Sequence, residues 1–97
     1  MKINQIRAGM DGITLTGRIV NISNKTEVET RYGKAHVANA VLEDNTGKIV
    51  LNLWRSQIDS VKVGDIIKIE NGFVRTFQQR LELNVGRRGR ITVISRG

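Results

Sequence analysis

The sequence predicts an all-β fold, because three features of its pattern agree. The apolar residues fall in short runs rich in Ile, Val and Leu, Gly and Asn separate these runs, and no long segment shows the 3.6-residue period of a helix. A chain of 97 residues is long enough for one modest hydrophobic core and too short for two. We therefore expect a single domain over residues 1–97 that is a β-barrel or a β-sandwich.

The first strand is expected over residues 13–23, where Ile13 and Leu15 alternate with polar residues. The alternation changes phase around Gly17, which predicts a bulge that bends the strand. The polar stretch 24–34 that follows has the composition of a long, mobile hairpin loop with frayed strand ends.

A hairpin follows, with its second strand over 36–43 and its third over 48–54. The residues between them, Asp-Asn-Thr-Gly at 44–47, are typical of a tight turn. One or two helical turns are expected within 55–63, before a Gly-Asp pair ends them.

The fourth strand begins at Ile66 and the fifth covers 80–85, where apolar and polar residues alternate. A last short strand is possible over 91–94, residues 1–10 are expected to pack on the barrel as an extension, and residues 86–97 form a basic C-terminal segment. Five strands with a short helix between the third and the fourth are the layout of the OB-fold, a partly open Greek-key barrel. A basic β-sandwich is the alternative, but it has no need of that helix.

The charge balance points to a polyanionic partner. There are 16 basic against 9 acidic residues, a net charge of +7, which attracts nucleic acid; an acidic protein or an anionic membrane surface fits the charge as well. No apolar run is long enough to span a bilayer, no basic amphipathic helix is apparent, and residues 1–10 lack the apolar core of a secretion signal. We expect a cytoplasmic, nucleoid-associated protein.

Catalytic and metal-binding chemistry finds little support. The absence of cysteine excludes disulfides, thiolate zinc sites and cysteine nucleophiles. His36 is the only histidine, and no nucleophile elbow, P-loop or paired-carboxylate motif is present. We expect no enzyme activity, no cofactor and no metal.

Alternation along the third strand separates two faces. One face is apolar and must be core, which leaves Asn52 and Trp54 on the opposite, outward face. The only tryptophan of the chain is thus placed to offer a flat surface to a ligand, or else it covers the end of the barrel. The residues of the core face are Ile49, Leu51 and Leu53.

The fourth strand adds two more aromatic residues. A bulge at Asn71 and Gly72 would let Val74 point inward, so that Phe73, Arg75 and Phe77 share the outward face. An aromatic, a cation and an aromatic at alternate positions suit stacked bases flanked by phosphates. The alternative is that one phenylalanine is core and the phase changes elsewhere.

Cations are expected around this outward face to contact phosphates. Tyr32, at a hairpin tip, is a fourth candidate for stacking or packs against its own loop. Residues 80–97 hold five arginines against one acid, Glu82, and form a basic patch that either contacts phosphates or is only solvated. The candidate cations are Arg31, Lys34, Arg55, Arg75, Arg80, Arg87, Arg88 and Arg90.

The strings DNTGKIVLNLW and VKVGDIIKIENGFVRTFQQRLELNVG, within residues 44–86, resemble the single-stranded DNA-binding OB domains of crenarchaeal type, which are similar to the DNA-binding domains of replication protein A. The resemblance extends over roughly residues 6–94 and implies that Trp54, Phe73 and Phe77 stack on bases. Relatives often carry tryptophan where this chain has Phe73, which implies a smaller stacking area. Crenarchaeal members also carry a glycine-rich tail with an acidic end that recruits partners, and this sequence ends at Gly97 without one.

The leading interpretation is sequence-tolerant binding of single-stranded DNA, which protects exposed strands in replication, repair or recombination. Two alternatives remain. One is an OB domain of the anticodon-binding type that binds single-stranded or structured RNA. The other is an OB subunit that docks other proteins through an apolar patch.

Overall fold

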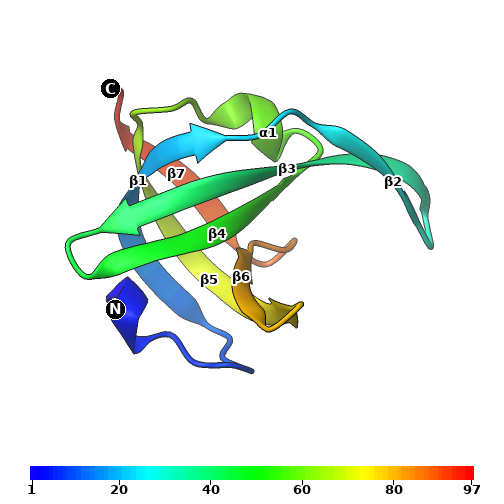
Figure 1. The fold of residues 1–97 in the computed structure, drawn as a ribbon. Helices are drawn as coiled ribbons and strands as arrows, with labels where there is room; N and C mark the ends of the chain where they lie inside the picture. The colour runs from blue at the N-terminus through cyan, green and yellow to red at the C-terminus, as the bar shows by residue number, and fades with distance from the viewer.

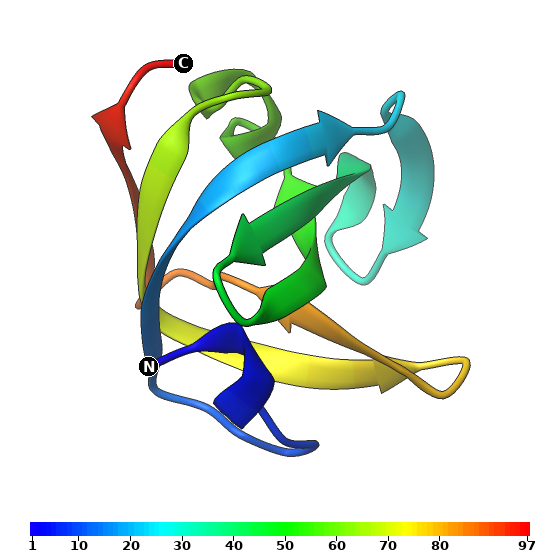
Figure 2. The same cartoon turned by 60° about the vertical axis from the view of Figure 1, so that its left-hand side comes forward.

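A single seven-stranded sheet closes on itself to form the barrel in the computed structural model, which describes residues 1–97 (Figures 1 and 2). The elements are a 3-10 turn η1 (Ile3–Gln5), strands β1 (Ile13–Ile22), β2 (Thr26–Thr30), β3 (Gly33–Asp44) and β4 (Gly47–Trp54), helix α1 (Gln57–Ser60), and strands β5 (Ile66–Phe77), β6 (Arg80–Asn84) and β7 (Arg90–Ser95). The neighbour order is β1-β3-β4-β6-β5-β7; β1 also pairs with β5 and so closes the barrel, and β2 pairs with β3. The β4–β6 pair is parallel and the other pairs are antiparallel.

The predicted OB-fold layout is confirmed. Strands β1, β3, β4, β5 and β6 are the five expected strands, and the single helical turn α1 lies between β4 and β5, which are the third and fourth of them. The count rises to seven because β2 extends the β3 hairpin and β7 adds to β5 over five residue pairs.

The prediction of a long loop over residues 24–34 was wrong. Strand β2 pairs with β3 in five consecutive registers, and only Arg31 and Tyr32 lie in the turn. The hydroxyl of Thr30 accepts from the Tyr32 amide at 3.1 Å and donates to the Gly33 carbonyl at 2.7 Å. The β-branched residues at 26, 28 and 30 suit a strand, but the strand is mostly exposed, so it lacks the apolar pattern that would have identified it.

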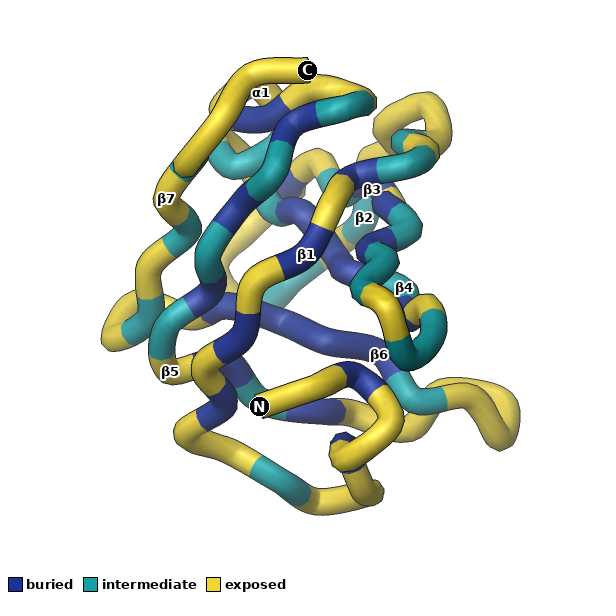
Figure 3. Tube along the Cα trace, turned by 90° about the vertical axis from the view of Figure 1, so that its left-hand side faces the viewer, coloured by how far each residue is buried: buried dark blue, intermediate teal, exposed yellow.

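The phase of β1 was also predicted wrongly. Ile13, Leu15, Gly17 and Ile19 are all buried, so the alternation continues through the glycine. Figure 3 shows buried and exposed residues alternating along β1. The register against β3 shifts only at Val20. Gly17 is needed for a different reason. A Cβ atom there would lie 2.8 Å from the Glu43 carbonyl oxygen and 2.9 Å from Cγ of Leu42, both on the neighbouring strand.

The predicted faces of β4 and β5 are confirmed. Ile49, Leu51 and Leu53 are buried, as are Ile67, Ile69 and Val74. Between Ile69 and Val74, the register against β1 moves from Ile69 opposite Leu15 to Gly72 opposite Ile13, so the one β1 residue between these pairs faces two residues of β5. Asn71, with a φ of 56°, takes the left-handed conformation at this bulge.

The two ends of the chain are both attached to the barrel. Ile3 and Ile6 belong to the core cluster, and the Ile3 amide donates to the Asp44 carboxylate at 2.8 Å. At the other end, Nη1 of Arg96 donates to Asp65 at 2.9 Å. None of the helical segments has the length and hydropathy of a transmembrane helix.

Two carboxylates make the fold sensitive to acid. Burial alone would raise the pKa of Asp65, but donation from the Lys62 and Gly97 amides, together with Arg96, outweighs burial and lowers it. Burial would likewise raise the pKa of Asp44, but hydrogen bonds from the Thr46 hydroxyl and from the Ile3, Thr46 and Gly47 amides outweigh burial and lower that pKa. Since both folded values are depressed, this stabilisation is present above the ordinary pKa of 3.8 and is lost as the pH falls through the folded values.

We expect the melting temperature to fall as the pH is lowered below 3.8, measured by thermal unfolding between pH 7 and about pH 2. The variant D65N is expected to be less stable at pH 7 and to lose less stability on acidification, because the Asp65 contribution is already gone. A melting temperature that stayed constant or rose on acidification would contradict this assignment.

Candidate nucleic-acid interface

The outward faces of four neighbouring strands form one continuous surface. Val37 of β3 lies opposite Trp54 of β4, and Asn52 of β4 lies opposite Asn84 of β6, which lies opposite Phe73 of β5. Both the β2–β3 hairpin and the β5–β6 hairpin project from the same side of the barrel and flank this surface (Figures 1 and 2).

Trp54 is half-buried at the end of β4, and its position is fixed at two points. Its indole Nε1 donates to Oδ1 of Asn84 at 3.1 Å, and its backbone amide donates to Oε1 of Gln57 at 2.9 Å. Gln57 in turn donates to the Val85 carbonyl at 2.9 Å, so it links the ends of β4 and β6. The indole is therefore held by its polar edge, which leaves its rings for other contacts.

A groove of about 510 Å³ opens beside the indole; we call it the Trp54 groove. It brings together five of the residues selected from the sequence, which come from separate parts of the chain: Tyr32, Trp54, Arg55, Phe73 and Arg87. Tyr32 is 79% exposed at the tip of the β2–β3 hairpin, and its ring is therefore available at the groove edge rather than packed against its own loop.

Trp54 also borders a second hollow of about 370 Å³, the Phe77 hollow. Asn52, Phe77 and Arg80 line it together with residues of β2 and β3. Phe77 is 52% exposed, which is unusual for a large apolar side chain and leaves it available to a ligand.

Phe73 is partly covered by a neighbouring cation. The guanidinium carbon of Arg75 lies over its ring, 5.5 Å from the centroid, within the range of a cation–π contact. A further hollow of about 550 Å³ adjoins Phe73 and is lined by Arg75, Arg87 and Arg88. Arg87 and Arg88 occupy the turn between β6 and β7. Nδ2 of Asn71, at the β5 bulge, donates to the Arg88 carbonyl at 3.2 Å and so links this turn to β5.

Not all of the candidate cations gather at this surface. Arg31 lines none of the three hollows, and Lys34 pairs loosely with Glu27 at 3.9 Å in solvent. The arginines of residues 80–97 are divided: Arg80 pairs with Glu82 and Arg96 with Asp65, whereas Arg87 and Arg88 have no acidic partner within 4.0 Å. The basic C-terminal segment thus places cations at this surface mainly through the β6–β7 turn.

The family of single-stranded DNA-binding proteins described as Ssb-like, with an OB fold, matches residues 6–93. The chain belongs to this family. The match includes every strand of the outward surface and nearly the whole barrel.

Two named relatives of this Ssb-like domain are archaeal. The single-stranded DNA binding protein Ssb of Saccharolobus solfataricus is 29% identical over 94 residues, which are 97% of this chain and 64% of that protein. Replication factor A of Methanothermobacter thermautotrophicus is 35% identical over 95 residues, which are 94% of this chain and 12% of that protein. The chain thus spans less than two thirds of the length of either relative.

Solved structures agree with the family assignment. The OB domain of Ta0387 from Thermoplasma acidophilum superposes with a TM-score of 0.83 at 25% identity and covers 100% of this chain and 88% of its own. A crystal structure of a replication protein A domain from Methanococcus maripaludis gives 0.79 at 31% identity and covers 99% and 96%.

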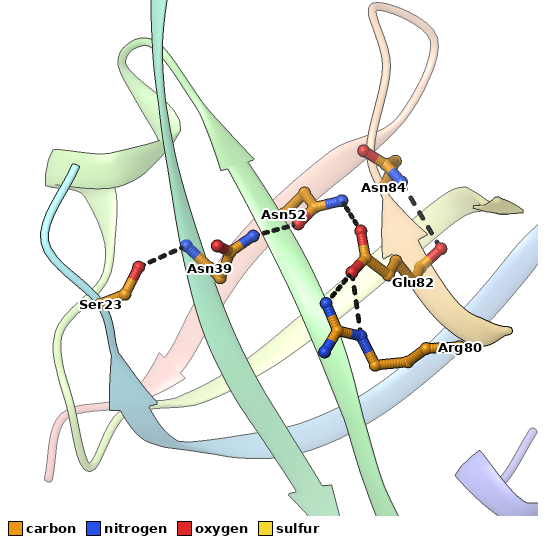
Figure 4. A network of polar contacts seen from close by, with 6 residues as sticks. All are labelled: Ser23, Asn39, Asn52, Arg80, Glu82 and Asn84. Carbon is orange, nitrogen blue, oxygen red and sulfur yellow. Dashed lines mark hydrogen bonds and ion pairs between the residues drawn. The ribbon is translucent and has the colours of Figure 1, made fainter. Parts of the chain in front are cut away.

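The sequence reasoning missed four residues of the Ssb-like domain that organise this surface. Gln57 and Asn84 hold Trp54, while Asn39 and Glu82 belong to a row of polar contacts across the sheet (Figure 4). Alternation places Glu82 and Asn84 on the outward face, but the parallel pairing of β4 with β6 is not visible in the sequence. Without that pairing, the contacts of these residues with Asn52 and Trp54 could not be found.

Clusters of three or more His, Cys, Asp or Glu side chains that could hold a metal ion do not occur. His36 lies 3.9 Å from Glu27 on the exposed hairpin, away from the outward surface described above.

Proposed function

We propose that this domain binds single-stranded DNA with little sequence preference, by stacking bases on Trp54, Phe73 and Phe77 and by neutralising phosphates with arginines. The observation that carries the proposal is the arrangement around Trp54, whose indole is fixed at its edge and borders both the Trp54 groove and the Phe77 hollow. Both relatives are named for single-stranded DNA binding or replication, which supports the same ligand class.

Stacking suits this role because every base has a π-face, so the contact tolerates any sequence. Each stacked base contributes about 1 to 3 kcal/mol. Trp54 borders two hollows, one of which reaches Phe73 and the other Phe77. This arrangement supports a path along which successive bases stack.

The electrostatic part of the proposal rests on Arg55, Arg75, Arg87 and Arg88, which border the aromatic residues and lack acidic partners within 4.0 Å. Contacts with a single strand release counterions, so the logarithm of the binding constant should fall by about 0.7 per contacted phosphate for each tenfold rise in salt.

The test is a titration with a short oligothymidine that follows the fluorescence of Trp54, the only tryptophan. We expect saturable quenching, weaker binding at higher salt, and little response to a matched duplex. An oligouridine of the same length, run in competition, separates DNA from RNA.

Absence of quenching at low salt by a folded protein would overturn the stacking role of Trp54. If binding to a protein partner were then found to be insensitive to salt, the aromatic residues would instead form a docking patch.

A further inference from the structure

Arg80 is held in one orientation on the outward face of β6. Its Nε and Nη2 atoms both donate to Oε2 of Glu82, at 3.1 and 2.6 Å. The Glu82 side chain is only 9% exposed, whereas that of Arg80 is 57% exposed. An exposed guanidinium thus rests on a buried carboxylate.

The carboxylate is itself anchored in the sheet. Its other oxygen, Oε1, accepts from Nδ2 of Asn52 at 2.9 Å, and Oδ1 of Asn52 accepts from Nδ2 of Asn39 at 2.6 Å (Figure 4). This row of hydrogen bonds joins β3, β4 and β6. Arg80 is its exposed end and is therefore more restricted than an ordinary surface arginine.

The pairing uses only one side of the guanidinium. Glu82 takes the Nε–H and one N–H of Nη2, which leaves both N–H groups of Nη1 and the second N–H of Nη2. No protein acceptor bonds Nη1. These free donors form the planar end-on fork of arginine, which fits two adjacent acceptors.

The fork lies next to a proposed stacking residue. Phe77 and Arg80 are direct cross-strand partners, joined by a turn whose central residues, Gln78 and Gln79, both have positive φ, at 49° and 66°. Such partners have Cβ atoms about 4.5 to 5.5 Å apart. Both line the Phe77 hollow, which places the free donors of Arg80 beside the ring proposed to stack on a base.

We propose that Arg80, positioned by Glu82, reads a guanine base stacked on Phe77 through its O6 and N7 atoms. This inference rests on the proposed single-strand binding and adds a base preference at one position. Guanine offers two adjacent acceptors on its O6–N7 edge, whereas adenine offers an acceptor beside a donor and thymine a single acceptor there. Cytosine has adjacent acceptors on its N3–O2 edge, but its smaller ring covers less of Phe77.

The experiment compares labelled oligothymidines of about 12 nucleotides, within the usual site size of an OB-fold, by fluorescence anisotropy. One central thymine is replaced by guanine, inosine, 7-deazaguanine, adenine or cytosine, and a single guanine cannot form a quadruplex. Guanine and inosine, which keep O6 and N7, are expected to bind about 5- to 10-fold more tightly than thymine. 7-Deazaguanine, which lacks N7, should lose most of that gain.

Two variants and a control connect the preference to the residue. R80K keeps the charge but removes the fork, so the preference for guanine over thymine at the central position should disappear. E82Q keeps the shape but weakens the anchor, so the preference should become smaller. R18K changes an exposed arginine of β1 outside the three hollows. It should change neither the preference for guanine nor the affinity for plain oligothymidine.

Equal binding to all the oligonucleotides would overturn the inference and leave single-strand binding intact. A preference for cytosine, or an R80Q variant that weakens every sequence equally and lowers the salt slope by about 0.7, would also overturn it, because Arg80 would then read another edge or a phosphate. Failure to bind any oligonucleotide would overturn the proposed function as well.

Discussion

Replacement of Trp54 by alanine is expected to weaken the binding of single-stranded DNA by about 5- to 150-fold, because one stacking contact contributes about 1 to 3 kcal/mol. The loss should lie at the upper end of this range, since Trp54 borders both the Trp54 groove and the Phe77 hollow. Because this variant has no tryptophan, its affinity is measured by the fluorescence anisotropy of a labelled oligothymidine.

The matched control is W54F. Both variants lose the hydrogen bond from Nε1 to Asn84, but only W54A also loses the aromatic face. W54F should therefore keep most of the affinity, and the difference between the two isolates stacking. If W54A bound as tightly as the unchanged protein while retaining its melting temperature, Trp54 would have only a structural role at the barrel end.

The variant G17A is expected to destabilise the fold by about 1 to 3 kcal/mol, the usual cost of overpacking a core. The new Cβ atom would meet the Glu43 carbonyl oxygen at 2.8 Å, and this backbone atom cannot move without disturbing the β1–β3 pairing. Thermal unfolding should show a fall of about 4 to 8 °C for each kcal/mol.

G47A provides the control for this variant. At Gly47 the nearest atom to an added Cβ is Cγ2 of Ile3 at 3.8 Å, an ordinary contact, and the backbone is not left-handed there. Its melting temperature should stay close to that of the unchanged protein. Equal stability of G17A and G47A would show that β1 and β3 can separate at Gly17 without loss.

Much of the outward surface could be predicted because it depends on local alternation. The faces of β4 and β5 follow from the positions of Ile49, Leu51, Leu53 and Val74, and the bulge follows from an Asn-Gly pair. Strand β2 and the phase of β1 were predicted wrongly for two different reasons. Edge strands need few apolar residues, and a glycine required for close approach looks the same in a sequence as one that forms a bulge.

The contacts between distant residues were beyond reach from the sequence. Asn84 meets Trp54, and Glu82 meets Asn52, each 30 residues away along the chain, only because β4 and β6 run parallel. Parallel neighbours are connected by a crossover rather than a turn, so no local signal reports their register. The sequence therefore predicts which residues face outward but not which of them touch.

The parallel β4–β6 pair also links ligand binding to the integrity of the whole molecule. The indole of Trp54 and the side-chain amide of Asn84 that holds it come from β4 and β6, which are joined by a crossover through α1 and β5. The aromatic surface therefore exists only after the entire Greek key has assembled. A partly unfolded chain has no such surface to offer. Under the proposed function, a bound strand therefore stabilises the native state, and by mass action it shifts the equilibrium further from global unfolding as its free concentration rises above the dissociation constant.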